Sequence, residues 1–377
     1  MLRVNDVLYG SITFTPVLAK IIDTTHFQRL AHLQQLGVCS LVYPGATHTR
    51  KSHSLGVCHL AGVWMTHLQQ LQPELHITFR MIELVMIAAL LHDVGHTMYS
   101  HLFDHDLAPL LNITHKDHEE RSIVLLNVIN REEELGLTTE EIEVISCMIQ
   151  GKAYENSKWP RYVFQIVSST IDVDKMDYLK RDSYYTAVPC GFQYDRIIFN
   201  SRVIDGELCF HRKVAKNILQ MLHTRYYFYS EIYHHKTVMV ISKMMSDAIK
   251  AALPFLSIEP HFQHETNWEV FNDHSIVTMI KEHPDATEAQ AILKRIETRD
   301  LYKMKVTTHS QEQDCEQNCV NVGYHNRNTN PLLELWFYHY EEGSEKGAQK
   351  LIKARIDLDV DIGPILPKNF HSIRSLV

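Results

Sequence analysis

Apolar residues recur at three- and four-residue spacings through most of the first 300 positions of this 377-residue chain. The stretch PVLAKIIDTTHFQRLAHLQQL (16–36) follows this spacing, which is typical of an amphipathic helix. HSLGVCHLAGVWMTHLQQL (53–71) predicts a second such helix. TFRMIELVMIAALLHD (78–93) is apolar on nearly all sides, which predicts a helix at the centre of the fold.

Two further helices are predicted before the pattern changes. TTEEIEVISCMI (138–149) begins with a threonine cap and an acidic first turn, and TRYYFYSEIYHHKTVMVISKMMSDAIKAAL (224–253) is a long helical pattern closed by Pro254. After Lys305 the chain becomes polar and Asn-rich, as loops around a short strand are. LLELWFYHYEE and ARIDLDVDI (354–362) alternate as strands do, separated by the turn-like EEGSEKGAQK.

These patterns predict a mainly α protein with a helical core over residues 1–300 and a small α+β lobe over residues 301–377. Hydrophobic residues make up 45% of the chain and charged residues 22%, the balance of an ordinary globular protein. The formal net charge of −8 attracts neither nucleic acid nor an anionic membrane, so a bound polyphosphate would need a local cluster of cations.

Cysteine usage and the apolar segments bear on the compartment. The seven cysteines are scattered, which favours free thiols. The first residues lack the pattern of a signal peptide, and the most apolar stretch, 84–91, is too short to cross a bilayer. We therefore expect a cytoplasmic or nuclear protein that does not bind membranes.

Histidine outnumbers glycine, 25 to 14, and the histidines concentrate in LLHDVGHTMYSHLFDHD (90–106). His92 and Asp93 are neighbours on a helix and point about 100° apart, so they can share a metal only if it lies close to the backbone. His53 and Asp174 are candidate partners from elsewhere, and Gly56 and Gly95 permit close approach. Such a mixed nitrogen and oxygen ligand set suits Fe, Mn, Zn, Ni or Mg.

The segments SHSLG, LLHDVGH and DVDKMDY carry the H…HD…D pattern, and in them the chain resembles the HD-domain phosphohydrolases. Further blocks, including VYPGATHTRKSHSLGV and HTRYYFYSEIYHHK, are similar to the dNTP triphosphohydrolase branch of that family. They look most like the animal enzymes that join a sterile-alpha-motif domain to an HD domain. The likeness covers nearly the whole chain, without the sterile-alpha-motif domain.

The resemblance implies hydrolysis of a dNTP to deoxynucleoside and tripolyphosphate by water attacking the α-phosphorus. It implies a divalent metal on His53, His92, Asp93 and Asp174, and a second Mg²⁺ carried by the substrate triphosphate. The acid–base group beside the metal would be His101, Asp104, His118 and Glu119, with His118 as leaving-group acid oriented by Glu119.

The resemblance also assigns substrate contacts. Arg50, Lys175 and Arg225 match the triphosphate contacts. The contacts to the sugar and its 3′-hydroxyl match Gln35, Tyr178 and Asp182, and Leu36 with Tyr178 would crowd the 2′ position. Tyr233 and His234 lie where the family packs base and sugar, and Tyr229 replaces a histidine of that site.

The residues expected to bind activator nucleotides differ in part from those of the family that the chain resembles. The animal enzymes assemble when a guanine nucleotide and dNTPs bind between subunits, and Asp23, Gln28 and Arg299 match parts of those activator sites. Ala31 stands where an arginine is expected, and Leu2 or Arg3 where a lysine is expected. The chain has Asp357, Asp359 and Asp361 where the family is basic. We expect weakened activator gating in a homodimer or homotetramer.

Two other functions are possible at this stage. One is a different HD-domain phosphodiesterase or nucleotidase, against which the three expected cations argue. The other is a non-catalytic binder of nucleotides or single-stranded nucleic acid, against which the complete ligand set argues. Arg225 could also be a structural ion pair, and His96, His101 and His105 could form a solvated helix face. Lowering of dNTP pools would suit antiviral defence or nucleotide homeostasis.

Overall fold

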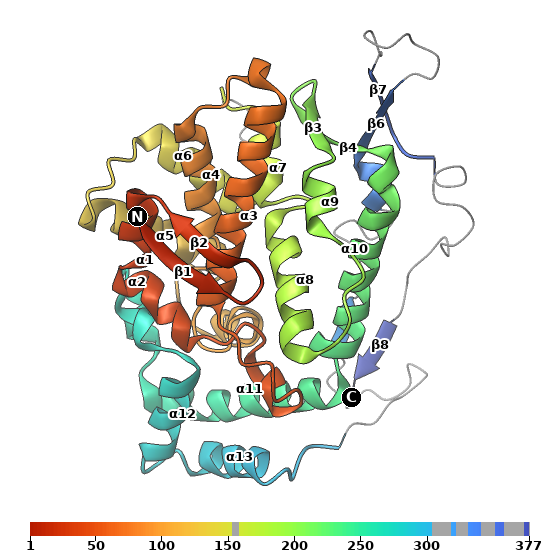
Figure 1. Cartoon of the computed structure of the whole chain (residues 1–377). Helices are drawn as coiled ribbons and strands as arrows, with labels where there is room; N and C mark the ends of the chain where they lie inside the picture. Colours follow the sequence, from red (N-terminus) through yellow and green to blue (C-terminus); the bar gives the residue numbers. More distant parts are fainter. Residues whose placement is uncertain (153–157, 304–317, 322–330, 341–350, 358–372, 377) are drawn as a thin grey trace.

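Helices make up most of the part of the chain that the computed structural model describes, which is residues 1–152, 158–303, 318–321, 331–340, 351–357 and 373–376 (Figure 1). The α-helices are α1 (Pro16–Ile22), α2 (Thr25–Gln28), α3 (Arg50–Leu71), α4 (Phe79–Leu91), α5 (His118–Glu132), α6 (Thr139–Ile149), α7 (Arg161–Val167), α8 (Val173–Thr186), α9 (Tyr194–Ile198), α10 (Ala215–Phe228), α11 (Lys236–Leu256), α12 (Asp273–Glu282) and α13 (Thr287–Glu297). The strands are β1 (Leu2–Asp6), β2 (Gly10–Phe14), β3 (Ser201–Ile204), β4 (Glu207–His211), β5 (Asn318–Asn321), β6 (Trp336–Tyr340), β7 (Leu351–Ala354) and β8 (Ile373–Leu376).

Short helical turns connect these elements. The 3₁₀ turns are η1 (Arg29–His32), η2 (Gly37–Leu41), η3 (Pro73–Leu75), η5 (Ala108–Leu110), η6 (Arg212–Val214), η8 (Glu259–Gln263), η9 (Asn267–Val270) and η10 (Pro331–Glu334). Two turns are π-helical, η4 (Phe103–Leu107) and η7 (Tyr229–Tyr233). Such wide turns are rare and occur often at functional sites.

The centre of the fold is α4, as its apolar sequence predicts. It packs against α3, α6 and α7, and it lies beside α3 in Figure 1. Thr78 begins it, because the Thr78 Oγ1 accepts a hydrogen bond from the Met81 backbone N–H at 3.1 Å. The predicted cap of α6 is confirmed as well: Thr138 and Glu141 form a reciprocal capping box. The observed architecture confirms a mainly α fold with a small mixed sheet.

Two long helical patterns are interrupted where the sequence predicts continuity. The 16–36 segment breaks after Ile22, since the Thr24 side chain caps α2 by accepting from the Phe27 N–H. The 224–253 segment breaks between η7 and α11. Pro254 does not close α11 but lies inside its last turn, and the helix ends at Leu256 before Ser257, whose φ is 45°.

Strands in the first 300 residues are the main feature that the helical pattern misses. β1 and β2 form an antiparallel hairpin, and β3 with β4 form another. β4 also pairs in parallel with β6, which pairs antiparallel with β7, so one four-stranded sheet has the order β3-β4-β6-β7. This sheet takes strands from both sides of residue 300, and the domain division there stays a prediction.

The C-terminal hairpin is shifted from its predicted position. The predicted strand over 332–342 is confirmed for Trp336–Tyr340, preceded by the η10 turn. Its partner is Leu351–Ala354, which precedes most of the predicted strand 354–362. Asp359 and Asp361 lie outside the described residues.

Among the described residues, no helix is long and apolar enough to cross a membrane. Five of the cysteines are free thiols within that part of the chain: Cys39, Cys58, Cys147, Cys190 and Cys209.

Candidate metal centre and histidine cluster

Three helices bring together the side chains that could hold a metal. His53 lies in the first turn of α3, His92 and Asp93 follow the end of α4, and Asp174 lies in the first turn of α8. The ligand atoms of His53, His92 and Asp174 lie within 4.8 Å of one another. Asp93 completes the set, with its Oδ1 3.5 Å from the His92 Nε2 and its Oδ2 3.8 Å from the His53 Nε2.

Both imidazoles are oriented by a hydrogen bond at Nδ1. The His53 Nδ1 donates to the Asp177 Oδ2 at 2.7 Å, and the His92 Nδ1 donates to the Ala89 carbonyl at 2.9 Å. Each Nε2 therefore points toward the ligand carboxylates, and within the described residues neither makes a well-formed hydrogen bond, although the His53 Nε2 lies 3.1 Å from the Asp174 Oδ1. Two unpaired imidazole nitrogens facing two carboxylates fit a divalent cation with open coordination positions.

The electrostatics of this site show that protons and a cation would compete for it. Burial opposes the charged form of His53, but the Asp174 and Asp177 carboxylates beside its two ring nitrogens raise its pKa to about 10. Burial likewise opposes ionisation of Asp174, yet the His53 and His92 rings beside its carboxylate hold its pKa well below the usual range. Binding of a metal would displace the protons that this cluster otherwise holds.

Gly56 and Gly95 do allow close approach, although the groups that approach them are not a metal. A Cβ on Gly56 would lie 2.0 Å from the Asp177 Oδ1, so the glycine makes room for the carboxylate behind His53. A Cβ on Gly95 would lie 2.2 Å from the His118 carbonyl oxygen and 2.4 Å from the Ser122 nitrogen. Gly95 therefore lets the start of α5 pack directly against the turn after His92.

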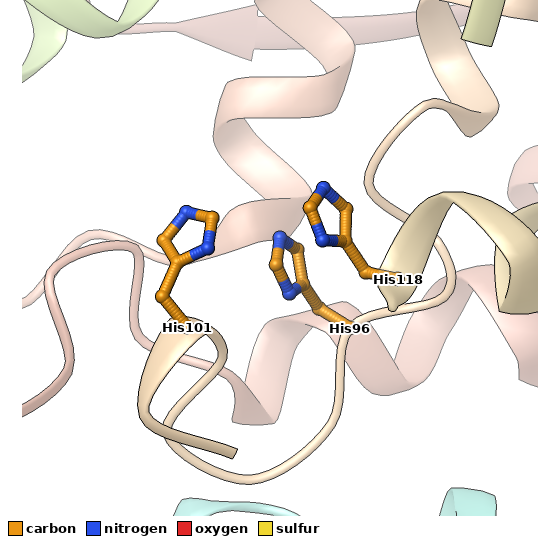
Figure 2. Close-up of side chains that lie close together, drawn as sticks. All are labelled: His96, His101 and His118. Atoms are coloured by element: carbon orange, nitrogen blue, oxygen red, sulfur yellow. The ribbon is translucent and has the colours of Figure 1, made fainter. Parts of the chain in front are cut away.

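His96, His101 and His118 form a second cluster, whose side chains are drawn in Figure 2. The rings of His96 and His118 are stacked, with centroids 3.8 Å apart and an angle of 13° between planes. His101 stands edge-on to both, at 5.1 Å and 5.5 Å. The two clusters meet at Asp93, whose Oδ1 lies 3.4 Å from the His96 Nε2.

Asp104 is the closest carboxylate to His118. Its Oδ2 accepts a hydrogen bond from the His118 Nδ1 at 2.9 Å, and its Oδ1 accepts from Arg121. The Glu119 Oε2 is 3.6 Å from the same Nδ1, and its side chain is 40% exposed. Against the effect of burial, hydrogen bonding to His118 and the nearby cations hold the pKa of Asp104 far below its usual value. His118 is thereby oriented with its Nε2 available for proton transfer.

His96 is a candidate functional residue to which the sequence assigns no role. Its side chain is fully buried, and neither ring nitrogen has a hydrogen-bond partner in the part of the chain that the structure describes. Burial, with Arg50 and His118 nearby, holds its pKa well below the usual value, so it is neutral. Its position four residues after His92, in HDVGH, is the signal that could have indicated a role.

The backbone turn that carries His96 is held by two arginines that sequence analysis also missed. Arg29 donates to the carbonyls of Val94 and His96, and Arg121 donates to the Gly95 carbonyl. The Trp268 ring lies 4.7 Å from the Arg29 guanidinium and 5.8 Å from that of Arg121. Three consecutive carbonyls are therefore fixed by buried cations.

The segment after this turn has an unusual backbone. Tyr99 and Ser100 have φ of 53° and 52°, in the left-handed region that side chains other than glycine rarely adopt. The Tyr99 N–H donates to the Asp273 Oδ1 at 2.6 Å, which stabilises this conformation. The π-helical η4 follows and carries Asp104. Strain of this kind is common at functional sites.

The three expected triphosphate contacts all have partners within the chain. Arg50 is buried and donates to the Asp93 Oδ2 at 2.5 Å and to the Ser100 Oγ at 2.7 Å. The Lys175 Nζ lies 2.6 Å from the Asp172 Oδ2. Arg225 is set over the Tyr229 ring at 5.4 Å. Only Arg50 contacts the metal centre directly among these described interactions.

Asp182, one of the expected sugar contacts, has two side-chain partners. The Asp182 Oδ1 lies 2.8 Å from the His48 Nε2, and its Oδ2 accepts from the Tyr233 hydroxyl at 2.5 Å. Tyr178 lies one helical turn before Asp182 on α8 and interacts with Arg225. The η7 turn places Tyr233 beside Asp182, so the break in the long helical pattern brings two candidate substrate contacts together.

The three remaining substrate-contact candidates, Gln35, Leu36 and His234, differ in how fully their side chains are engaged. The Gln35 Oε1 is buried and has no hydrogen-bond partner, which suits a ligand contact. Leu36 packs against the hydrophobic core, and the His234 Nδ1 lies 2.9 Å from the Tyr229 carbonyl.

Two of the three candidate activator residues, Gln28 and Arg299, are hydrogen-bonded to other residues of the chain. Asp23 is exposed at the end of α1. Gln28 donates to the Ile22 carbonyl at 2.7 Å and accepts from the Lys51 Nζ at 2.5 Å. Arg299, with a φ of 63°, donates to the Leu41 carbonyl at 2.5 Å.

Two protein-family models match this chain. Residues 50–182 match the model of the HD domain, and residues 192–329 match that of the HD-associated region. The first of these matches spans every metal-ligand candidate.

Individual relatives extend the similarity over most of the chain. The deoxynucleoside triphosphate triphosphohydrolase SAMHD1 homolog of Dictyostelium discoideum is 37% identical over 306 residues, covering 80% of this chain and 59% of that protein. The deoxynucleoside triphosphate triphosphohydrolase SAMHD1 of Homo sapiens is 36% identical over 338 residues, covering 80% of this chain and 54% of that protein. The chain thus spans little more than half the length of these relatives.

A viral relative is matched over most of its length. The HD domain-containing protein L394 of Acanthamoeba polyphaga mimivirus is 30% identical over 368 residues, covering 89% of this chain and 79% of that protein. With the ligand geometry and the two family matches, this similarity shows that the chain belongs to the HD-domain family, in the branch that includes the SAMHD1 proteins.

Proposed function

We propose that this protein is a metal-dependent dNTP triphosphohydrolase, which converts a dNTP and water into deoxynucleoside and tripolyphosphate. The observation that carries the proposal is the contact at Asp93 between a complete metal-ligand set and a histidine cluster suited to proton transfer. The curated relatives that carry the name of this activity support the choice of substrate.

The proposed roles of the metal-centre residues follow from the nitrogen and oxygen atoms that they bring together. His53 and His92 would hold a divalent cation through Nε2, with Asp93 and Asp174 as oxygen ligands. The cation would supply positive charge beside the phosphate oxygens and lower the pKa of water. Arg50 neutralises part of the carboxylate charge through its hydrogen bond to Asp93.

Proton transfer is assigned to the histidine cluster. In the proposal, His118 gives a proton from its Nε2 to the departing 5′-oxygen, while Asp104 holds the proton on Nδ1. His101 is exposed and stands edge-on to His118, where it can exchange protons with the attacking water. Glu119 lies farther from the His118 Nδ1 than Asp104 does and contributes negative charge.

Substrate binding is assigned to the candidates around Asp182. Arg50, Lys175 and Arg225 would bind the triphosphate, with the second Mg²⁺ neutralising more of its charge. Asp182, Gln35 and Tyr178 would contact the sugar, with Leu36 and Tyr178 against its 2′ position. The base would lie near Tyr233 and His234. The Tyr233 hydroxyl and His48 already fix the Asp182 carboxylate for this purpose.

Weakened activator gating is part of the proposal. Gln28 and Arg299 are hydrogen-bonded to the carbonyls of Ile22 and Leu41 in their own chain. Their side chains are therefore already held in place without a bound nucleotide, which supports weakened gating. Ala31 supplies no cation to an activator phosphate. A homodimer or homotetramer would then be active without GTP.

Product analysis tests the proposal. Purified protein is incubated with each dNTP and Mn²⁺ or Mg²⁺, with and without GTP, and the products are separated by ion-pair chromatography. We expect deoxynucleoside and tripolyphosphate without GTP. Asp174→Asn removes a ligand and should abolish the products, whereas Asp247→Asn, which alters a pair with Lys243 on α11, should not.

Each other outcome has a definite meaning. The same products only with GTP would support the reaction and contradict the weakened gating. Release of a single phosphate would support an HD-domain nucleotidase or phosphodiesterase. Metal binding without any hydrolysis would support a nucleotide or single-stranded nucleic-acid binder.

A further inference from the structure

A buried carboxylate stands behind the metal-ligand candidate His53. Asp177 on α8 is fully buried and accepts four hydrogen bonds. Its Oδ2 accepts from the His53 Nδ1 at 2.7 Å and from the Arg181 Nε at 2.9 Å. Its Oδ1 accepts from the Arg181 Nη2 at 2.9 Å and from the Tyr9 hydroxyl at 2.8 Å. These bonds fill the acceptor capacity of a carboxylate, so its orientation is fixed.

The fourth hydrogen bond to Asp177 comes from a residue near the N-terminus. Tyr9 lies in the turn of the β1–β2 hairpin, 168 positions before Asp177. The hairpin runs over α3 in Figure 1, and its turn is joined to α8 by this hydrogen bond.

Asp6 fastens the same turn to the same network. Its Oδ1 accepts from the backbone N–H groups of Leu8 and Tyr9, at 2.8 Å and 3.2 Å, which shapes the turn. Its Oδ2 accepts from the Arg181 Nη1 at 2.9 Å. Asp6 therefore holds both Tyr9 and Arg181, the two residues that share Asp177 with His53.

The network has no free space on its α3 side. A Cβ on Gly56 would lie 2.0 Å from the Asp177 Oδ1 and 2.4 Å from the Arg181 Nη2. Asp177 is thus held between α3 and the hairpin, with its Oδ2 toward His53.

We propose that Tyr9 and Asp6 are positioning residues of the metal centre, which act on His53 through Asp177 and Arg181. This inference rests on the metal site of the proposed function. A carboxylate that accepts from Nδ1 fixes the tautomer with a free lone pair on Nε2 and makes that nitrogen a better ligand. The hairpin would thereby contribute to metal affinity from outside the set of ligand candidates.

A purely structural role for Tyr9 is separable from this one. The Tyr9 ring packs against His59 at 5.1 Å and edge-on to Tyr194 at 5.8 Å. Tyr9→Phe keeps these ring contacts and removes only the hydroxyl. Tyr162→Phe is the matched control, since it removes a buried hydroxyl that has no hydrogen-bond partner within the described residues.

The test measures Mn²⁺ affinity by competition with a chelator, together with the thermal midpoint of the metal-free protein. We expect Tyr9→Phe to weaken Mn²⁺ binding about 10-fold, as loss of an outer-shell partner does, and Tyr162→Phe to leave it unchanged. Asp6→Asn keeps the turn acceptor but loses the ion pair with Arg181, and should weaken binding in the same direction. Equal Mn²⁺ affinity in Tyr9→Phe and the unaltered chain, whatever the thermal midpoint, overturns the inference.

Failure of the proposed function is distinguishable from failure of this inference. If the unaltered protein binds Mn²⁺ but hydrolyses no dNTP, the proposed function fails and the variants still decide the positioning role. If the unaltered protein binds no divalent metal, both fail.

Discussion

Two buried carboxylates act on the histidines that matter most to the proposed chemistry. Asp177 accepts from the Nδ1 of His53, and Asp104 accepts from the Nδ1 of His118. In both cases an arginine, Arg181 or Arg121, satisfies the remaining oxygen. In the proposed chemistry, the same arrangement would prepare one imidazole as a ligand and the other as a proton donor.

Asp104→Asn tests the second of these arrangements. An amide cannot accept from both His118 and Arg121 through two oxygens, so His118 loses its fixed orientation. We expect kcat for dNTP hydrolysis to fall about 100-fold while Mn²⁺ affinity stays unchanged. The comparison is Glu119→Gln, which should cost far less because its carboxylate is 3.6 Å from the His118 Nδ1. A larger loss in Glu119→Gln would show that Glu119, rather than Asp104, orients His118.

The sequence indicates ligands better than it indicates the residues that orient them. His53, His92, Asp93 and Asp174 are recognisable from their motifs, and the structure brings them together. Asp177 and Tyr9 carry no such mark, because their role depends on contacts across 168 positions. A hydrogen bond at that separation follows from the tertiary fold and not from spacing in the chain.

At the scale of elements, the close packing of α3 against α8 depends on Gly56, which has no side chain. Gly56→Ala would place a Cβ 2.0 Å from the Asp177 Oδ1, and this carboxylate has no room to move. We expect the variant to lose at least about 2 kcal/mol of unfolding free energy and to bind Mn²⁺ weakly. Gly62→Ala on the same helix meets only the flexible end of Met86, at 2.9 Å, and should be near neutral because alanine favours a helix. Equal stability of both variants in urea unfolding would contradict this argument.

His26 joins three elements through a charge that depends on pH. Its Nδ1 lies 2.7 Å from the Glu269 Oε2 on η9, and its Nε2 lies 3.0 Å from the Glu132 Oε2 on α5. The hydrogen bond to Glu269 raises the pKa of His26 above its ordinary value of 6.5, although burial opposes this. Because the folded-state pKa is raised, the stabilisation is complete below pH 6.5 and is lost as the pH rises through the folded-state pKa.

His26→Gln should therefore destabilise the protein in a pH-dependent way. The variant should lose roughly 1–2 kcal/mol of unfolding free energy at about pH 6, and the difference from the unaltered chain should shrink toward about pH 9. Urea unfolding of both proteins across this range is the measurement. A difference that is constant with pH would mean that His26 contributes packing alone.

Element types were easier to predict than their limits. Local sequence indicates α4 and α6, since α4 is apolar on nearly all sides, α6 has an apolar face, and each begins at a threonine cap. It fails where a local interaction overrides it, as at Thr24, and where the π-helical turn η7 interrupts a continuous pattern. Short strands such as β3 and β4 carry too few residues for alternation to be distinguished from a helical pattern.

At the scale of the whole molecule, one sheet connects the helical core with the C-terminal segment. β4 pairs in parallel with β6, with Phe210 opposite Phe337. Both side chains are buried, and their rings lie 6.3 Å apart. The paired residues of these two strands lie 125 or more positions apart, so the pairing follows from the tertiary fold and no local pattern predicts it.

This connection predicts that residues 1–300 do not form an independent unit. Without β6, the β4 edge and the buried Phe210 would be exposed, and an unpaired apolar edge promotes aggregation. Phe337→Ala in the full chain should cost about 3–4 kcal/mol of unfolding free energy, whereas Leu333→Ala, at an exposed position, should cost little. If a 1–300 fragment were soluble, with the thermal midpoint and Mn²⁺ affinity of the full chain, the sheet would be an appendage, and the boundary predicted from composition would be a true domain boundary.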